Sequence, residues 1–125
     1  MPHRVLIVED DETLRWVMSE GVKLLGLDVA ECSTADEALI LLGRPPSVDL
    51  IITDIQMPGS INGLGLARLV WSRWPSMPVV ITSGHANLPQ STLPPNSRFL
   101  PKPCALEVLH AAVVALLPLG AGAKS

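Results

Sequence analysis

Three short runs of apolar and β-branched residues, VLIV at 5–8, LIIT at 50–53 and VVIT at 79–82, constrain the fold more than any other feature. Such β-branched runs are typical of strands buried on both faces, as in a parallel sheet covered by helices on both sides. Weaker strand patterns are present at 28–32 and 99–100. The sequence therefore predicts five short strands.

Apolar residues recur at helical spacing between these strands. Thr34 and Glu37 have the spacing of a capping box, which predicts the start of the second helix. The stripes that mark the first, third and last helices are Leu14, Met18, Val22 and Leu25; Leu66, Val70 and Trp74; and Leu106, Leu109, Val113 and Leu116. Regular alternation of strand and helix predicts an α/β fold with a doubly wound parallel sheet and right-handed crossovers.

One segment breaks the alternation. Between Ser83 and Phe99, where another helix is due, the chain carries Pro89, Pro94 and Pro95. Each proline lacks a backbone donor and disfavours helix at the residue before it. We therefore expect the fourth helix to be missing or reduced to a single turn.

Composition narrows the class of protein. The 125 residues fit one domain, which we place at 1–118 and follow with a short flexible tail at 119–125. A net charge of −3 without any basic run argues against direct binding to nucleic acid. The N-terminal sequence MPHRVLIVEDD has too few apolar residues before its acids to be a signal peptide. The apolar stretch 111–123 is broken by Pro118 and is too short to span a membrane. We expect a cytoplasmic protein.

The predicted strands end in residues that carry chemistry. Glu9 and Asp10 follow the first strand, Asp54 the third and Lys102 the fifth, while the fourth ends at Thr82-Ser83. Ligands bind beyond the carboxyl ends of the strands in sheets of this type, so these groups should meet at one edge.

The chemistry of that cluster can be predicted from its charges. Two carboxylates about 4 Å apart repel by roughly 4 kcal/mol at an effective dielectric of about 20, so a cation is needed between them. Oxygen ligands favour Mg2+, which leaves room for phosphate oxygens. An ionised Asp54 beside the metal can attack phosphorus and form an aspartyl phosphate. Lys102 and a Ser or Thr hydroxyl would hold the transferred oxygens.

The motifs VLIVEDDE, LIITDIQMPG, the glycine in SINGL, PVVITSGH and FLPKP occur in this order. Over about residues 3 to 117 the chain resembles the receiver domain of response regulators in bacterial two-component systems. The resemblance implies a flavodoxin-like five-stranded sheet in the order 2-1-3-4-5. It also implies a signalling domain in a phosphorelay, whose only reactions are self-phosphorylation from phosphodonors and autodephosphorylation.

The resemblance assigns roles to individual residues. Asp54 matches the phosphoacceptor, and Lys102, followed by Pro103 across a cis peptide bond in the family, matches the phosphate-contacting lysine. Asp10 corresponds to a direct Mg2+ ligand and Glu9 to one that acts mainly through water. The backbone carbonyl of Gln56 completes the protein's share of the metal shell.

Other matches concern the response to phosphorylation. Counting from Pro78 places the switch hydroxyl on Ser83, with Thr82 turned away from the site, and the switch aromatic on Phe99. Gln56 and His85 match positions that tune how fast water reaches the phosphoryl group. Asp11 is better interpreted as the cap of the first helix. The loop GSING carries one residue more than the commonest receiver pattern.

Three functions are compared. The first is a phosphorelay domain that accepts phosphate from a histidine kinase or histidine phosphotransfer protein, with no output domain after the last helix; a stand-alone regulator and a piece of a longer protein both fit. An aspartate-nucleophile phosphohydrolase is disfavoured, because such enzymes usually have a second acid where this chain has Gln56. A partner-binding receiver that is never phosphorylated is not indicated, because Asp10, Asp54, Ser83 and Lys102 are all present.

Overall fold

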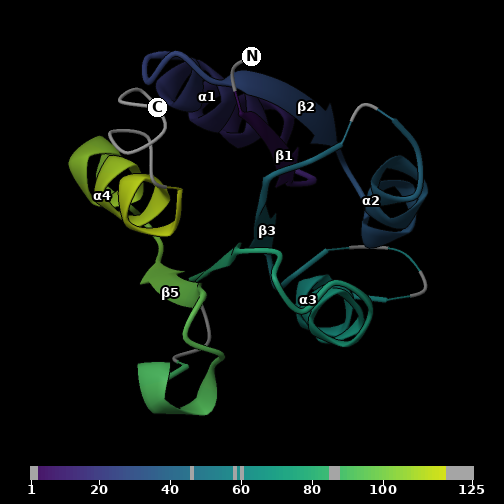
Figure 1. Ribbon diagram of the computed structural model, residues 1–125. Helices are drawn as coiled ribbons and strands as arrows, with labels where there is room; N and C mark the ends of the chain where they lie inside the picture. The colour runs from purple at the N-terminus through teal and green to yellow at the C-terminus, as the bar shows by residue number, and fades with distance from the viewer. Residues whose placement is uncertain (1–2, 46, 58, 60, 85–87, 118–125) are drawn as a thin grey trace, which may run out of the picture.

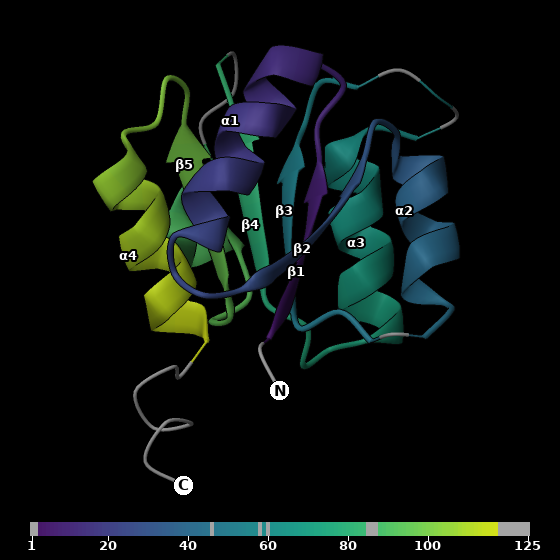
Figure 2. The ribbon, with the colours of Figure 1, turned by 90° about the horizontal axis from the view of Figure 1, so that it is seen from above.

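Five parallel strands form a single sheet in the order β2-β1-β3-β4-β5, as predicted. The computed structural model describes residues 3–45, 47–57, 59, 61–84 and 88–117. All strands point their carboxyl ends to the same edge of the sheet (Figure 2). Their bounds are Arg4–Val8 (β1), Asp28–Cys32 (β2), Leu50–Asp54 (β3), Val79–Ser83 (β4) and Ser97–Pro101 (β5).

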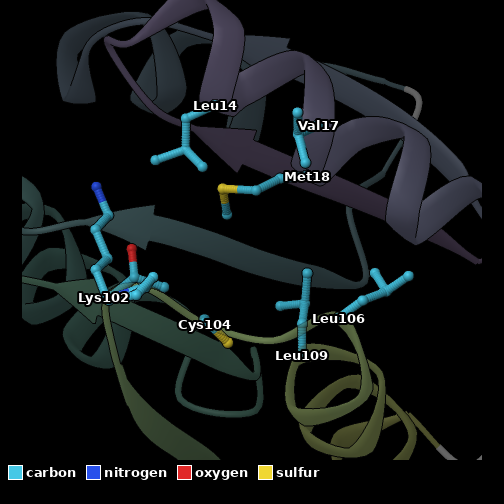
Figure 3. A pocket seen from close by; sticks show the side chains of 9 residues that line it. Leu14, Val17, Met18, Lys102, Cys104, Leu106 and Leu109 are labelled. Atoms are coloured by element: carbon cyan, nitrogen blue, oxygen red, sulfur yellow. The ribbon is translucent and has the colours of Figure 1, made fainter.

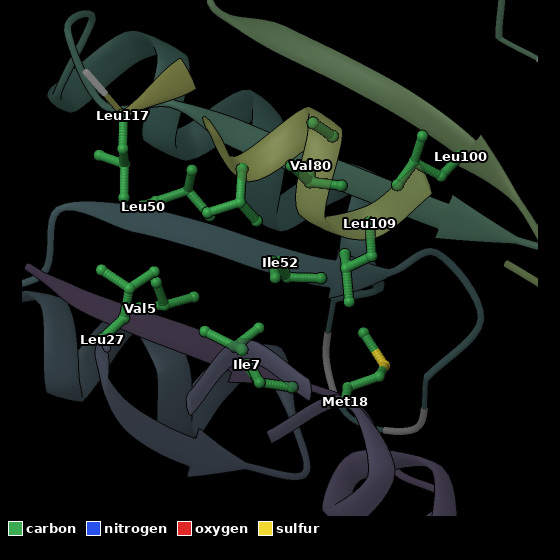
Figure 4. Close-up of a cluster of buried hydrophobic side chains, with 13 residues drawn as sticks. Val5, Ile7, Met18, Leu27, Leu50, Ile52, Val80, Leu100, Leu109 and Leu117 are labelled. Atoms are coloured by element: carbon green, nitrogen blue, oxygen red, sulfur yellow. The ribbon is translucent and has the colours of Figure 1, made fainter. Parts of the chain in front are cut away.

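Helices cover both faces of the sheet. α1 and α4 lie on one face, and α2 and α3 lie on the other (Figure 1). Successive strand side chains point to opposite faces, so each strand contributes to two cores. Val5, Ile7 and Ile52 belong to the core under α1 and α4 (Figure 4), and Leu6 and Ile51 to the core under α2 and α3. The helices span Glu12–Lys23 (α1), Ala35–Leu42 (α2), Gly63–Arg73 (α3) and Leu106–Leu116 (α4).

Side chains cap the first two helices at the predicted positions. Asp11 Oδ1 accepts the backbone N–H of Leu14 at 2.9 Å, which confirms its role as the cap of α1. Thr34 Oγ1 accepts the backbone N–H of Glu37 at 3.1 Å. In a standard capping box the Glu37 carboxylate would accept the backbone N–H of Thr34. Here it accepts the backbone N–H of Ser33 at 3.3 Å and the Ser33 hydroxyl at 2.8 Å.

The proline-bearing segment has no α-helix over its described residues, 88–96, and holds one short 3-10 helix, Gln90–Thr92 (η1). This confirms the expected missing helix. Leu88, Leu93 and Trp71 pack against the core under α2 and α3. Gln90 Nε2 donates to Ser97 O at 2.7 Å, and Trp71 Nε1 donates to Ser97 Oγ at 2.9 Å. These contacts attach η1 and α3 to the first residue of β5.

The last described helix, α4, ends at Leu116. The predicted domain boundary at 118 and the tail at 119–125 lie outside the described residues and stay predictions. Among the helices described, none has the length and apolar character that a membrane crossing requires.

Candidate functional site

Separate strands bring Glu9, Asp54 and Lys102 together at the carboxyl edge of the sheet. Lys102 Nζ lies 3.0 Å from Glu9 Oε1 and 2.9 Å from Asp54 Oδ2. Both carboxylates are buried, with side chains 1% and 6% exposed, whereas the lysine side chain is 24% exposed. The predicted convergence of the ends of β1, β3 and β5 is therefore present.

Asp54 occupies the last position of β3, at the centre of the sheet. Its neighbour in β4 is Thr82, and the backbone N–H of Ile55 donates to Thr82 O at 3.0 Å. Gly63, the glycine in SINGL, lies directly against this turn: a Cβ there would come within 1.7 Å of Asp54 O. The start of α3 can therefore approach the acceptor residue only because position 63 has no side chain.

Three acidic residues could hold a metal ion. One carboxylate oxygen from each of Glu9, Asp10 and Asp54 lies within 4.8 Å of the other two. Asp54 Oδ2 is engaged by Lys102, whereas Oδ1 is buried and has no hydrogen-bond partner among the described residues. Three carboxylate groups this close together, one of them from the exposed Asp10, fit a small hard cation such as Mg2+.

Burial and hydrogen bonding have opposite effects on the pKa values of Glu9 and Lys102. Burial raises the pKa of Glu9, although the hydrogen bonds from Lys102 and from the Asp11 N–H partly offset that effect. For Lys102, burial disfavours the charge, but hydrogen bonds to Asp54 and Glu9 outweigh it and raise the pKa. The ammonium is therefore held charged beside Asp54 at neutral pH.

β4 ends in two adjacent hydroxyl residues, Thr82 and Ser83, whose side chains point to opposite faces of the sheet. Ser83 Oγ donates to Gln56 Oε1 at 2.9 Å. Thr82 alternates with it and lies on the same face as Val80, under α1 and α4. Thr82 Oγ1 has no hydrogen bond among the described residues, and the predicted orientation of Thr82 away from the site stays a prediction.

The other residues predicted for the site, Phe99, Gln56 and His85, differ in their surroundings. Phe99 is paired with Ile81 and packs, partly buried, on the core under α2 and α3. Gln56 is exposed and contacts the site through Ser83. The Lys102-Pro103 peptide bond is cis, as the resemblance implies. His85 falls outside the described residues.

Arg15 is a positioning residue that the sequence interpretation missed. Its Nη1 donates to Glu9 O at 2.8 Å, and its Nε lies 3.5 Å from Glu31 Oε1. The guanidinium thus ties the loop after β1 to β2. No local sequence pattern signals these contacts, because Glu31 lies on another strand and the Glu9 partner is a backbone carbonyl.

Comparison with known proteins identifies the family. The sequence model of the family described as "response regulator receiver domain" matches residues 5–114. The chain belongs to the response regulator receiver domain family. It is similar over its length to a receiver protein from Sinorhizobium medicae WSM419, with 29% identity, a TM-score of 0.85 and coverage of 94% of this chain and 95% of that one.

The chain is also similar to another receiver domain and to parts of longer response regulators. The non-phosphorylated HemR receiver domain from Leptospira biflexa matches at 28% identity and a TM-score of 0.77, with 91% of this chain and 93% of that chain covered. The NtrX-like response regulator of Rickettsia felis is 38% identical over 67% of this chain but only 18% of its own length. The transcriptional regulator DctD of Rhizobium meliloti is 33% identical over 70% of this chain and 18% of its own.

This receiver domain is accordingly a signalling domain of two-component signal transduction. It spans about 18% of the length of these curated relatives, so their activities as whole proteins do not transfer with the match. What the family contributes is the fold and the signalling role.

Proposed function

We propose that this receiver domain takes a phosphoryl group onto Asp54 from a histidine kinase or a histidine phosphotransfer protein, in a Mg2+-dependent reaction in the cytoplasm. The observation that carries the proposal is the asymmetry of the Asp54 carboxylate. Oδ2 is bound by Lys102 at 2.9 Å, and Oδ1 is buried without a hydrogen-bond partner among the described residues. Oδ1 therefore has no hydrogen bond that competes with attack on phosphorus, and we assign it as the nucleophile.

The transfer exchanges one bond to phosphorus for another. Asp54 Oδ1 forms a new O–P bond while the P–N bond to the donor histidine breaks, and the bonding electron pair returns to the imidazole nitrogen. Lys102 is placed to stabilise negative charge on the transferred oxygens, because its ammonium is already aimed at the carboxylate. Apart from this transfer and the later loss of the phosphoryl group to water, no enzymatic turnover is proposed.

Mg2+ would be held by Asp10 and Asp54, with the backbone carbonyl of Gln56 completing the protein ligands. Glu9 would act through water, since its two carboxylate oxygens already accept hydrogen bonds from Lys102 Nζ and the Asp11 N–H. Asp10 is exposed and is free to orient toward an ion. Bound Mg2+ supplies positive charge that offsets the charge of the acidic cluster and of the phosphoryl oxygens.

The switch would run from Ser83 to Phe99. Movement of the Ser83 hydroxyl onto a phosphoryl oxygen requires loss of its bond to Gln56. That movement would free space next to β5, into which the partly buried Phe99 ring turns. Gln56, and His85 beyond the end of β4, would tune how fast water removes the phosphoryl group.

Acetyl phosphate with Mg2+ provides the test. We expect a mass increase of one phosphoryl group in the native chain and its loss in Asp54→Asn. Asp28→Asn, which changes an exposed carboxylate at the opposite end of the sheet, serves as the matched control and should still be phosphorylated. Steady turnover of p-nitrophenyl phosphate would instead favour a phosphohydrolase, and absence of any adduct would favour a receiver that is never phosphorylated.

A further inference from the structure

A network of side chains fixes the peptide group that precedes Asp10. Arg15 Nη1 donates to the carbonyl oxygen of Glu9 at 2.8 Å, and that carbonyl belongs to the same peptide group as the backbone nitrogen of Asp10. A peptide group is planar, so a hydrogen bond to its oxygen also restricts the orientation of its nitrogen and of the Cα atom that follows. The exposed Asp10 side chain therefore extends from a backbone that is held in place.

Arg15 is itself oriented from β2. Its Nε lies 3.5 Å from Glu31 Oε1, and the other carboxylate oxygen of Glu31 accepts a hydrogen bond from the Ser19 hydroxyl at 3.0 Å. Ser19 lies one turn beyond Arg15 on α1 and is fully buried. Because the guanidinium is a planar group with fixed donor directions, the position of Glu31 restricts where Arg15 can place its Nη1.

Glu9 has further contacts that do not depend on Arg15. Its backbone N–H donates to the last residue of β2 at 3.1 Å, and its side chain accepts a hydrogen bond from Lys102 Nζ at 3.0 Å. Lys102 extends from the pocket between α1 and α4, which it lines together with Leu14 (Figure 3). Loss of the Arg15 bond should therefore loosen the peptide group next to Asp10 while Glu9 stays in place.

We propose that Arg15, held by Glu31 and Ser19, gives the acidic cluster a preference for Mg2+ over Ca2+ by fixing the backbone in front of Asp10. The proposal rests on the Mg2+ site of the proposed function. Mg2+ requires nearly ideal octahedral geometry at about 2.0–2.1 Å, whereas Ca2+ accepts oxygen ligands at about 2.3–2.6 Å in flexible arrangements. A loosened Asp10 can therefore still bind Ca2+, but its contribution to Mg2+ binding is reduced.

The charge of Arg15 has a different effect from its position. A cation near the cluster repels any divalent ion, so loss of that charge would strengthen the binding of both metals. Mg2+ and Ca2+ carry the same charge, so this effect largely cancels in the ratio of their dissociation constants. The ratio therefore separates a positioning role of Arg15 from a purely electrostatic one.

Titrations of the unphosphorylated, 15N-labelled chain with MgCl2 and with CaCl2, followed by NMR, give the two dissociation constants. Arg15→Lys keeps the charge and loses the planar fork. We expect the ratio of the Ca2+ to the Mg2+ dissociation constant to fall by about threefold to tenfold in this variant, the effect of one hydrogen bond. Ser19→Ala leaves every charge in place and should lower the ratio by about twofold. Arg68→Lys, the same change at an exposed arginine of α3, is the matched control and should leave it unchanged.

An unchanged ratio in folded Arg15→Lys would overturn the proposal. If that variant does not fold, Ser19→Ala decides in the same way, because it removes a single oxygen atom. A native chain that binds both cations equally well would also overturn the proposal, and one that shows no saturable Mg2+ binding would overturn the metal site with it. The titrations contain no phosphodonor, so their outcome is independent of whether Asp54 accepts a phosphoryl group.

Discussion

Ser83 Oγ donates a hydrogen bond to Gln56 Oε1 at 2.9 Å, which joins the end of β4 to the loop two residues beyond Asp54. The residue that must move in the proposed switch is thereby held by a residue beside the acceptor. The bond stabilises the unphosphorylated arrangement, because Ser83 cannot direct the same proton to Gln56 and to a phosphoryl oxygen.

Gln56→Ala should therefore shift the equilibrium toward the phosphorylated conformation. Loss of one hydrogen bond that exists only in the resting state corresponds to about 0.5–1.5 kcal/mol. The measurement is the phosphorylated fraction of each chain at limiting acetyl phosphate. The dephosphorylation rate of each chain is measured separately, and the fractions are corrected for any difference. Ser83→Ala, which removes the hydroxyl from both states, should not produce this gain; equal gains in both variants would refute the role of the bond.

Lys102→Met keeps the length of the side chain and removes its charge. We expect a loss of about 1–3 kcal/mol in the free energy of unfolding, because Glu9 and Asp54 lose a hydrogen-bond donor and repel each other. Mg2+ should restore part of this loss and EDTA should abolish the recovery, as measured by urea denaturation. A variant as stable as the native chain in EDTA would show that the lysine does not stabilise the acidic cluster.

Gly63→Ala should disrupt the turn behind Asp54. The added Cβ would lie within 1.7 Å of a backbone oxygen, so the start of α3 must shift, at a cost of about 3 kcal/mol. Gly65→Ala is the matched control on the same helix, where the nearest atom is Ile61 Cβ at 3.4 Å. That change should be neutral or stabilise by up to about 1 kcal/mol through helix propensity. Similar urea midpoints for the two variants would contradict the prediction.

The cap of α2 predicts a pH-dependent contribution to stability. Thr34→Ala should lower the free energy of unfolding by about 1 kcal/mol. Hydrogen bonds from the Ser33 hydroxyl and N–H lower the pKa of Glu37 in the folded state. The contribution of the Glu37 carboxylate to the free energy of unfolding is therefore fully present above its unfolded pKa of about 4.3. It is lost as the pH falls through the lower pKa of the folded state. A stability difference between native and Glu37→Gln proteins that does not change with pH would exclude this linkage.

The two cysteines should differ in reactivity. Burial raises the pKa of Cys32 to about 12, and the residue is only 6% exposed. Burial also raises the pKa of Cys104, but this residue is more accessible. Iodoacetamide at pH 8 should add one group to the folded chain, at Cys104, and two in urea, as read by peptide mass mapping. Faster reaction at Cys32 would mean that β2 opens readily.

Local sequence determined most of the fold. Continuous β-branched runs predicted the strands that lie between two helical layers, and Pro89, Pro94 and Pro95 predicted the missing helix, because these effects depend on neighbouring residues alone. The assignment of Asp11 as a helix cap was confirmed for the same reason. Convergence of the strand ends also followed from sequence, since parallel strands in one sheet share a carboxyl edge.

Only the tertiary structure decided which atoms of these residues meet. Lys102 contacts Asp54 across 48 positions of the chain, and Ser83 contacts Gln56 across 27. The unpaired Thr82 hydroxyl and the pocket between α1 and α4 likewise depend on how the two helices pack on the sheet. Sequence patterns report which face a side chain occupies, whereas contacts between distant segments depend on strand register and on the fit of side chains in the core.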